Sequence, residues 1–258
     1  MKKQIFGLLT DFGNDFAVAS IRGVLLKEAP ECTIIDIDHT VDKFNLVSAA
    51  FIIDKVHPFF PKETVFICIV DPGVGSERQP IYLHANNQHF FGPNNGIFHA
   101  LLKSNPLSSA FLIDETKFKI ASNTFHGRDL FSPAAAAFAH GKRDFLQLIE
   151  INQLEILPEL DNQTIVSFID SFGNIKTNIQ FPDTPDAKHK TATVVINDIS
   201  ETLPITNTFS AVPEGQLLAY KGSNNTLEIA INLGSAAQFF GAKAGNSVQF
   251  NFNNQPNL

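Results

Sequence analysis

The apolar positions along the first 145 residues alternate between two spacings. Between the strand-like runs, residues 15–29 and 45–56 carry apolar side chains three or four positions apart, as in a helix with one buried face. Pro30 ends the first helix, and Asn45 is a natural N-cap for the second. Repeated β–α units predict a mainly parallel sheet with helices on both faces. The strand-like runs lie at 4–10, 33–38 and 65–70.

The pattern of apolar positions changes near residue 160. Before that point, a hairpin around Asn86-Asn87 and helices in "GIFHALLKS" and "SPAAAAFAHG" complete an α/β domain. After it, helical spacing is rare and Gly, Pro and Asn separate short strands, which predicts a small antiparallel barrel or sandwich. We therefore expect an α/β domain over 1–158 and an all-β domain, a barrel or a sandwich, over 162–258. The expected strands lie at 164–169, 175–180, 192–196, 216–220, 226–232 and 247–252.

Composition restricts the possible partners. The 258 residues are 44% hydrophobic and 17% charged, as in a globular protein, and the net charge is −7 with no basic run. A partner rich in phosphate needs a positive face, so we expect neither nucleic acid nor an anionic membrane. No signal peptide or spanning segment is evident, and Cys32 and Cys68 lie in apolar runs. These features predict a cytoplasmic protein with a small-molecule or protein partner.

Acidic residues follow three of the predicted strands. The carboxyl ends of these strands carry Asp11, Asp38 with His39, and Asp71. Open parallel sheets bind ligands at this edge. The alternative for Asp11 is a helix N-cap. Neither a GxGxxG nor a GxxxxGK[ST] loop is present, which argues against a dinucleotide or nucleoside triphosphate site. No HxxxH, HxxE or CxxC spacing occurs, so we expect no metal.

Two loops carry the most reactive residue types. In "VDPGVGSER", Asp71 is followed seven residues later by Arg78, and the loop either forms a plain surface turn or joins the two side chains. If they meet, the arginine is expected to hold the pKa of the carboxyl below its usual range. In "NTFHGRDLFSPAAA", His126 stands at a predicted helix entrance, beside Arg128 and Asp129, which are placed to pair with each other.

Three further motifs remain, and two of them have both a structural and a functional interpretation. The turn "FGPNNGIF" is interpreted as architectural. In "IDSFGNIKTNI", a turn signature also offers a Phe and an Asn suited to stack on a flat base and to read its hydrogen-bonding groups. In the closing "LEIAINLGSAA", small residues permit either barrel closure or backbone contacts to a ligand.

Taken together, these motifs resemble one family over almost the whole chain. It is the S-adenosyl-L-methionine (SAM) hydroxide adenosyltransferases, adenosine-forming SAM hydrolases related to the fluorinase and chlorinase enzymes. The resemblance implies hydrolysis of SAM to adenosine and L-methionine without a cofactor. It also implies a Rossmann-like N-terminal domain, a C-terminal β-barrel, and a homotrimer with active sites between neighbouring subunits. The matching motifs are "LLTDFG", "VDPGVGSER", "FFGPNNG", "TFHGRDLFSPAAA", "DSFGNIKTNI" and "LEIAINLGSAA".

The resemblance also implies roles for individual residues. Asp71, Arg78 and His126 would form the catalytic set, as a hydrogen-bonded Asp–His pair oriented by the arginine. Asp11 would hold the ribose hydroxyls, and Phe44 would pack near the sugar. Thr124 and Phe125 would line the pocket, and Asp170 and Ser223 would contact the methionine portion. The adenine would be surrounded by Phe172, Asn174, Phe209 and the backbone around Ala236.

The nucleophile distinguishes this family from its halogenase relatives. Those enzymes carry Tyr at the position matching Asp71 and lack the matching Arg and His. A carboxylate there would repel a halide ion, so water is the expected nucleophile. Three departures from the family pattern are present. A short spacing leaves Asp15 without an implied role, Asp38 and Lys43 replace Thr and Pro, and Asn224 replaces the fluorinase Arg.

Two other functions stay open at this point. One is a SAM-dependent halogenase. The other, from a different class, is a binding module for SAM or adenosine with negligible turnover. Such a module would keep ligand contacts but would have no need of Asp71, Arg78 and His126 as a set.

Overall fold

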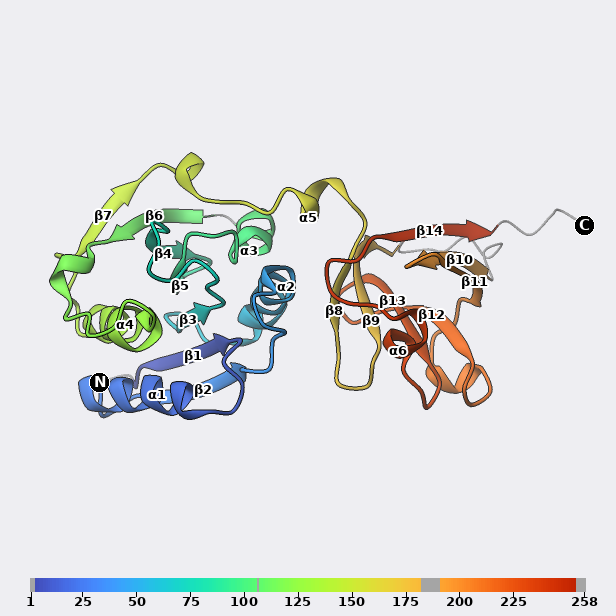
Figure 1. Cartoon of the computed structure of the whole chain (residues 1–258), viewed down its shortest axis with the longest axis horizontal. Coiled ribbons are helices and arrows are strands. Elements are labelled where there is room, and N and C mark those ends of the chain that lie inside the picture. Colours follow the sequence, from blue (N-terminus) through green and yellow to red (C-terminus); the bar gives the residue numbers. More distant parts are fainter. Residues whose placement is uncertain (1–2, 106, 182–190, 254–258) are drawn as a thin grey trace, which may run out of the picture. The chain divides into compact units, whose positions relative to one another are not determined.

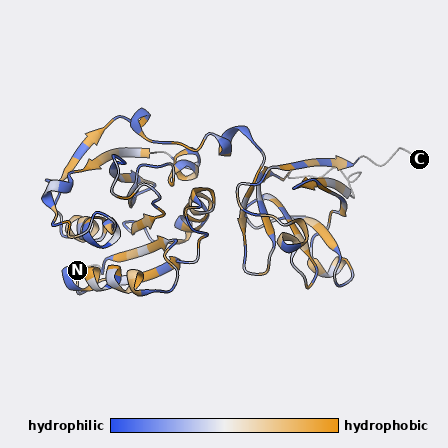
Figure 2. Ribbon diagram, in the orientation of Figure 1, coloured by the Kyte–Doolittle hydropathy of each residue, from blue (hydrophilic) through white to orange (hydrophobic). Residues whose placement is uncertain are grey.

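The computed structural model describes residues 3–105, 107–181 and 191–253. The chain forms two compact units, a first unit of residues 1–157 and a second of residues 158–258 (Figure 1). In both units the strands are predominantly apolar and the connecting loops predominantly polar (Figure 2). In the part of the chain described here, no helix has the length and apolarity that crossing a membrane requires.

The first unit is built on one seven-stranded sheet of order β2-β1-β3-β5-β4-β6-β7. The strands β2, β1, β3 and β5 are parallel, β4 is antiparallel to β5, β6 is antiparallel to β4, and β7 is antiparallel to β6. Five of the seven therefore run in one direction, as the β–α units predict. Their bounds are β1 Ile5–Thr10, β2 Thr33–Asp38, β3 Val65–Ile69, β4 Pro80–Ala85, β5 Gln88–Pro93, β6 Leu107–Ile113 and β7 Leu146–Ile149.

Helices cover both faces of this sheet. On one face, α1 packs with α4, and on the other α2 packs with α3 (Figure 1). The Asn45 side chain caps α2 as predicted, by accepting the Ser48 N–H at 2.9 Å. Asp15, not Asp11, caps α1, because its carboxylate accepts the Ala17 N–H. The helices are α1 Phe16–Glu28, α2 Leu46–Val56, α3 His99–Ser104 and α4 Ser132–Ala139, with short turns η1 His57–Phe59, η2 Glu115–Lys117, η3 Gly127–Phe131 and η4 Ile151–Gln153.

The order of the strands determines where a ligand can bind. From β1 the chain passes to β2 on one side and later to β3 on the other, so the sheet has its topological switch point between β1 and β3. In open α/β sheets, ligands bind beyond the carboxyl ends of the strands at such a point. Asp11 follows β1 directly, and Asp71 lies just beyond β3. These two acids therefore stand at the ligand-binding edge of the sheet.

The second unit consists of two antiparallel sheets, of order β12-β13-β9-β8 and β11-β10-β14. The prediction of short antiparallel strands in this part of the chain is confirmed. Buried apolar residues from both sheets form one cluster, so the sheets share a core. The elements are α5 Glu159–Asn162, β8 Val166–Ile169, β9 Ile175–Gln180, β10 Thr191–Ile196, β11 Ile199–Pro204, η5 Phe209–Ala211, β12 Leu217–Lys221, β13 Thr226–Ile231, α6 Ala236–Phe240 and β14 Val248–Asn253.

Candidate active site

Asp71 and Arg78 are joined by two charge-assisted hydrogen bonds. Nε of the arginine donates to Oδ1 at 3.1 Å, and Nη2 donates to Oδ2 at 2.6 Å. Both side chains are buried, with exposed fractions of 4% for Asp71 and 6% for Arg78. The loop after β3 thus brings Asp71 and Arg78 together, which excludes a plain surface turn. A bidentate pair of this kind fixes both groups in orientation.

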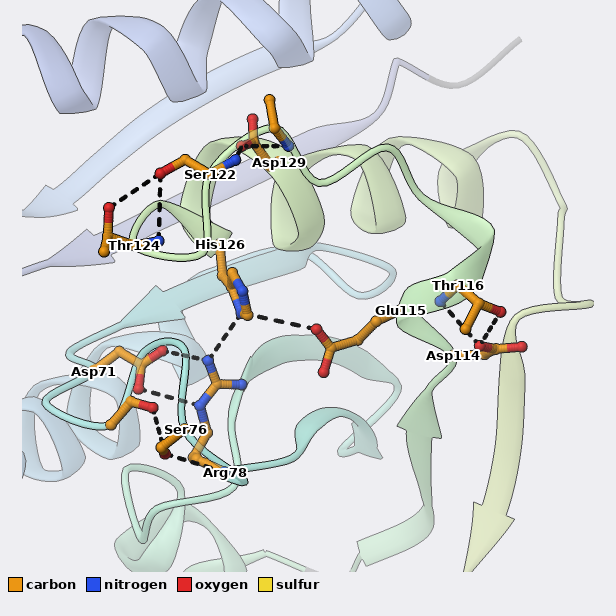
Figure 3. A network of polar contacts seen from close by, with 12 residues as sticks. Asp71, Ser76, Arg78, Asp114, Glu115, Thr116, Ser122, Thr124, His126 and Asp129 are labelled. Carbon is orange, nitrogen blue, oxygen red and sulfur yellow. Dashed lines mark hydrogen bonds and ion pairs between the residues drawn. The ribbon is translucent and has the colours of Figure 1, made fainter.

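Arg78 also contacts His126, 48 residues further along the chain. Nη2 lies 3.2 Å from the imidazole Nδ1 (Figure 3). Because a guanidinium can only donate, Nδ1 accepts this bond, and the neutral ring carries its proton on Nε2. Arg78 therefore stands between Asp71 and His126. The expectation of a direct Asp–His pair with the arginine at its side is wrong, since the arginine is the common partner of both.

Burial controls the acidity of Asp71. Loss of water around the carboxylate raises the pKa of Asp71 above its usual value, and the opposing attraction to Arg78 only partly offsets this. The depressed pKa expected from the arginine alone is therefore wrong in sign. A raised pKa makes the ionised carboxylate a stronger base than an exposed one.

A π-helical turn, η3, presents His126 from the entrance of α4. Asp129 in this turn pairs with Arg128 as predicted, and its carboxylate also accepts the backbone N–H groups of Ala121 and Ser122 at 3.1 and 2.9 Å. These bonds fold the preceding loop back onto the turn. The Arg128 hydrogen bonds chiefly account for the lowered pKa of Asp129. π-Helical turns are common at functional sites.

Gly75 lets the loop of Asp71 and Arg78 approach the loop that precedes His126. Its φ angle is +77°, and a Cβ atom there would lie 2.7 Å from the carbonyl oxygen of Asn123. Any other residue would push the loop of Asp71 and Arg78 away from the loop that precedes His126. Gly75, the second glycine in "VDPGVGSER", is therefore required for the geometry of the cluster.

A fourth ionisable group, Glu115, belongs to this cluster and was not predicted from the sequence. Its Oε2 lies 4.0 Å from Nδ1 of His126, and its side chain is 36% exposed. Asp114 fixes the turn η2 that carries it, by accepting both the N–H and the hydroxyl of Thr116 (Figure 3). No motif in the sequence includes Glu115, so only the fold reveals it.

Asp11 is engaged in the backbone of a neighbouring loop. Its Oδ2 accepts the Phe44 N–H at 2.8 Å, and among the described residues Oδ1 has no hydrogen-bond partner. This bond holds Phe44 at a φ of +66°, a strained value for a bulky side chain, with the ring 64% exposed. Strain of this kind is typical of ligand-binding positions. Asp11 and Phe44 thus place a carboxylate and an exposed aromatic ring together at the end of β1.

The other strand-end residues support the scaffold. His39 is buried, and its ring joins Thr10 at 2.8 Å to Asp36 at 2.9 Å. Asp38 accepts the N–H and hydroxyl of its neighbour Thr40, so it forms a local turn. In unit 1, Asp38 and His39 therefore hold loops in place beside Asp11. The turn "FGPNNGIF" is architectural too, because Asn94 and Asn95 bond to backbone groups of distant loops.

Thr124 and Phe125 lie directly before His126. The Thr124 side chain is exposed, and its hydroxyl lies 3.0 Å from that of Ser122. The Phe125 ring is edge-on to Phe12, with centroids 6.1 Å apart, and Arg128 lies over it at 4.7 Å. The two residues therefore belong to the loop that places the histidine.

The second unit contains an aromatic pocket of about 480 Å³. Three of the residues implied to surround an adenine, Phe172, Asn174 and Phe209, line it. The Phe172 ring is 77% exposed and Asn174 is buried, so the pocket combines a free aromatic face with an inner amide. Sequence reasoning missed four lining residues, although they belong to the quoted motif "LEIAINLGSAA". They are Ile231, Asn232, Leu233 and Gly234.

Asp170 organises the rim of this aromatic pocket. Its carboxylate accepts the N–H groups of Phe172 and Asn174 and the side-chain amide of Asn174, each at 3.0 Å. Lys176 lies 3.7 Å from Asp170 and 2.8 Å from the buried Glu228. Lys176 and Glu228 were not predicted as site residues, because their motifs gave no indication that they pair.

The remaining two predicted residues differ in exposure. Ser223 is exposed in the turn after β12. The Ala236 side chain is fully buried in the core of the second unit, so only its backbone can take part in a site. The neighbouring Ala237 N–H already bonds to the Gly173 carbonyl at 2.9 Å, which ties this segment to the turn of Phe172.

Comparison with known proteins identifies what this arrangement resembles. The family model described as "SAM hydroxide adenosyltransferase N-terminal domain" matches residues 6–148, and the corresponding C-terminal domain model matches residues 164–249. A curated protein from Thermus thermophilus, named (R)-S-adenosyl-L-methionine hydrolase, is 32% identical over 258 residues, 93% of this chain and 97% of that protein.

Two further relatives extend the comparison. A fluorinase from Actinopolyspora mzabensis is 25% identical and covers 96% of this chain and 97% of its own length. The crystal structure of an uncharacterized conserved protein from Thermotoga maritima is 30% identical, with a TM-score of 0.85 over 95% of this chain and 99% of that one. The hydrolase is thus closer in sequence than the fluorinase.

Proposed function

The chain belongs to the SAM hydroxide adenosyltransferase family, and on that premise we propose that it hydrolyses SAM to adenosine and L-methionine. The observation that carries this proposal is the buried cluster in which Arg78 bonds to both Asp71 and His126. A protein that only bound SAM or adenosine would have no need to bury three reactive groups in contact.

The chemistry needs little from the protein at the leaving group. The C5′–S bond breaks with its electron pair going to the positive sulfonium, so L-methionine leaves as a neutral thioether without a general acid. A water oxygen bonds to C5′ from the opposite side, and one proton is released. Positioning that water can contribute about 7–11 kcal/mol, and removal of its proton by a base typically contributes about 10²–10⁴-fold.

The three residues of the cluster divide these tasks. Asp71 as an anion complements the sulfonium charge, in a buried site where electrostatic attraction is strong. Arg78 orients both of its partners, and its Nη1 is buried without a partner among the described residues, which leaves two N–H groups for a ligand or water oxygen. His126 accepts from Arg78 through Nδ1.

Water is favoured over a halide as the nucleophile. A chloride or fluoride ion must lose its own water before it reacts, and an anionic Asp71 at the reacting carbon would repel it. The greater similarity to a curated hydrolase than to a curated fluorinase supports the same choice.

The substrate-binding roles follow the same resemblance. In the first unit, the partner-free Oδ1 of Asp11 is suited to accept a ribose hydroxyl, and the exposed ring of Phe44 to pack on the sugar. Thr124 and Phe125 would line the same site. In the second unit, the aromatic pocket would take the adenine against Phe172, Asn174, Phe209 and the backbone around Ala236, with Asp170 and Ser223 toward the methionine portion.

The remaining features of the proposal concern the whole molecule. We propose a cytoplasmic homotrimer with inter-subunit active sites, a Rossmann-like first domain and a barrel-like second domain, on the resemblance to the family. Both cysteines are free and buried, in keeping with a reducing compartment. We also propose that no metal or cofactor takes part, because a sulfonium needs no Lewis acid in order to leave.

The test is an incubation of the purified full chain with SAM, with EDTA present and without it. We expect adenosine and L-methionine in equal amounts, unaffected by EDTA, and a loss of at least about 100-fold in Asp71→Ala. The matched control is Glu77→Gln, an exposed acid on the same loop, which should retain full activity. SAM bound without turnover would favour a binding module, and a product that depends on halide would favour a halogenase.

A further inference from the structure

Nδ1 of His126 faces two groups of opposite character. Nη2 of Arg78, which can only donate a hydrogen bond, lies 3.2 Å away. Oε2 of Glu115, which as a carboxylate can only accept one, lies 4.0 Å away. The same nitrogen can accept from the arginine while it is unprotonated and donate to the glutamate once it is protonated. Figure 3 shows the three side chains converging.

A protonated ring needs an acceptor for the hydrogen on Nδ1. An imidazolium at this place would stand 3.2 Å from a permanently charged guanidinium, in a buried position. Asp71 attracts an imidazolium here, but both of its oxygens already accept bonds from Arg78, so it offers no acceptor for a hydrogen on Nδ1. Arg128 and Asp129, on the same turn as His126, pair with each other. Glu115 is therefore the one described acid near the ring that is not already paired.

A route from this position to solvent is also present. Arg78 and Glu115 both line a cavity of about 350 Å³, together with polar side chains of the loop after β3 and the ends of β6 and β7. Hydrolysis of SAM releases one proton for each turnover, and that proton has to leave the site. A partly exposed carboxylate at the wall of a polar cavity is suited to pass it on to water.

We propose that Glu115 is a positioning residue that enables His126 to take the proton of the attacking water at Nδ1, and that the polar cavity is the exit for this proton. This inference rests on the proposed function and names the proton acceptor within it. In the step, the water O–H bond breaks as the C5′–O bond forms. The lone pair of Nδ1 first gives up its bond from Arg78 and takes the proton, the new Nδ1–H donates to Glu115, and the proton then leaves through Glu115 to solvent.

The test compares Glu115→Gln with the wild type and with Glu77→Gln, which changes a second acid on the wall of the same cavity. We expect kcat of Glu115→Gln to fall about tenfold. The acid limb of its kcat profile should move to lower pH, since loss of the carboxylate disfavours protonation of His126. Added imidazole buffer should restore part of kcat, and Glu115→Asp should retain more activity than Glu115→Gln. Glu77→Gln should match the wild type.

The opposite results overturn the inference. A Glu115→Gln enzyme that is slower, but has an unmoved acid limb and no response to buffer, would mean that Glu115 only supports the fold. An unchanged kcat would remove it from the reaction.

A measurement without turnover separates this inference from the proposed function. ¹⁵N NMR of the His126 ring should show Nε2–H in the neutral form. At a fixed acidic pH, a smaller protonated share is expected in Glu115→Gln than in the wild type. Equal shares would contradict the role of Glu115 even if the wild type did not hydrolyse SAM.

Discussion

The Asp71–Arg78–His126 cluster of the first unit and the aromatic pocket of the second differ in how their side chains are held. In the cluster, each charged group is buried and bonded to the next, so its geometry is fixed before any ligand arrives. In the pocket, the Phe172 ring is 77% exposed and only the turn beneath it is fixed, by Asp170. Chemistry at one carbon atom requires preorganised groups, whereas stacking on a base tolerates a freer surface. Changes in the two regions should therefore affect different kinetic constants.

The largest effect is expected when the common partner of the cluster is changed. Arg78→Lys keeps the positive charge, but an ammonium cannot bond in one plane to both Asp71 oxygens and to His126. We expect kcat to fall by at least about 100-fold with little change in KM. The control is Arg128→Lys. Arg128 also makes two hydrogen bonds to one carboxylate, that of Asp129, but its side chain is 34% exposed. Comparable losses in both variants would contradict the special role of Arg78.

A smaller effect of a different kind is expected in the aromatic pocket. Phe172→Ala removes a stacking face without touching the reacting groups, so KM for SAM should rise about tenfold while kcat stays within about twofold. Phe239→Ala serves as the control, because this ring is also exposed in the second unit but does not line the pocket. A fall in kcat without a change in KM would show that the two regions are not separable in this way.

The smallest effect concerns pH and the charge of the ligand. SAM carries a sulfonium and S-adenosylhomocysteine does not, so ionised Asp71 should favour SAM. Because the pKa of Asp71 is raised, this preference should be present above that pKa and should decline as the pH falls through it, at a higher pH than for an ordinary carboxyl group. The ratio of Ki for S-adenosylhomocysteine to KM for SAM, measured against pH, checks this. A ratio that does not vary with pH would argue against direct contact of Asp71 with the sulfonium.

The sequence predicted those features that depend on local patterns. The β–α units and the Asn45 cap each follow from residues close together in the chain, and the contact of Asp71 with Arg78 was one of two alternatives that the sequence left open. Strand β11 was missed because it has only two large apolar residues, Ile199 and Leu203, which is too weak a pattern to predict a strand. Its hairpin turn at Asn197-Asp198, where both φ angles are positive, was an available signal.

Burial and long-range contacts could not be predicted in this way. The pKa direction of Asp71 was wrong because the carboxyl's loss of water depends on the surrounding fold, whereas its arginine partner is visible in the sequence. Glu115 was missed because it comes from a turn outside every motif, and His126 was placed beside Arg78 only by resemblance to the family. Contacts made across 48 residues become visible only in three dimensions.

The most direct test of hydroxide transfer to C5′ is hydrolysis of SAM in ¹⁸O-labelled water, with mass spectrometry of both products. The account predicts one labelled oxygen in adenosine, at the 5′-hydroxyl, and none in L-methionine. Unlabelled adenosine, or label in the amino-acid product, would contradict in-line attack of water at C5′.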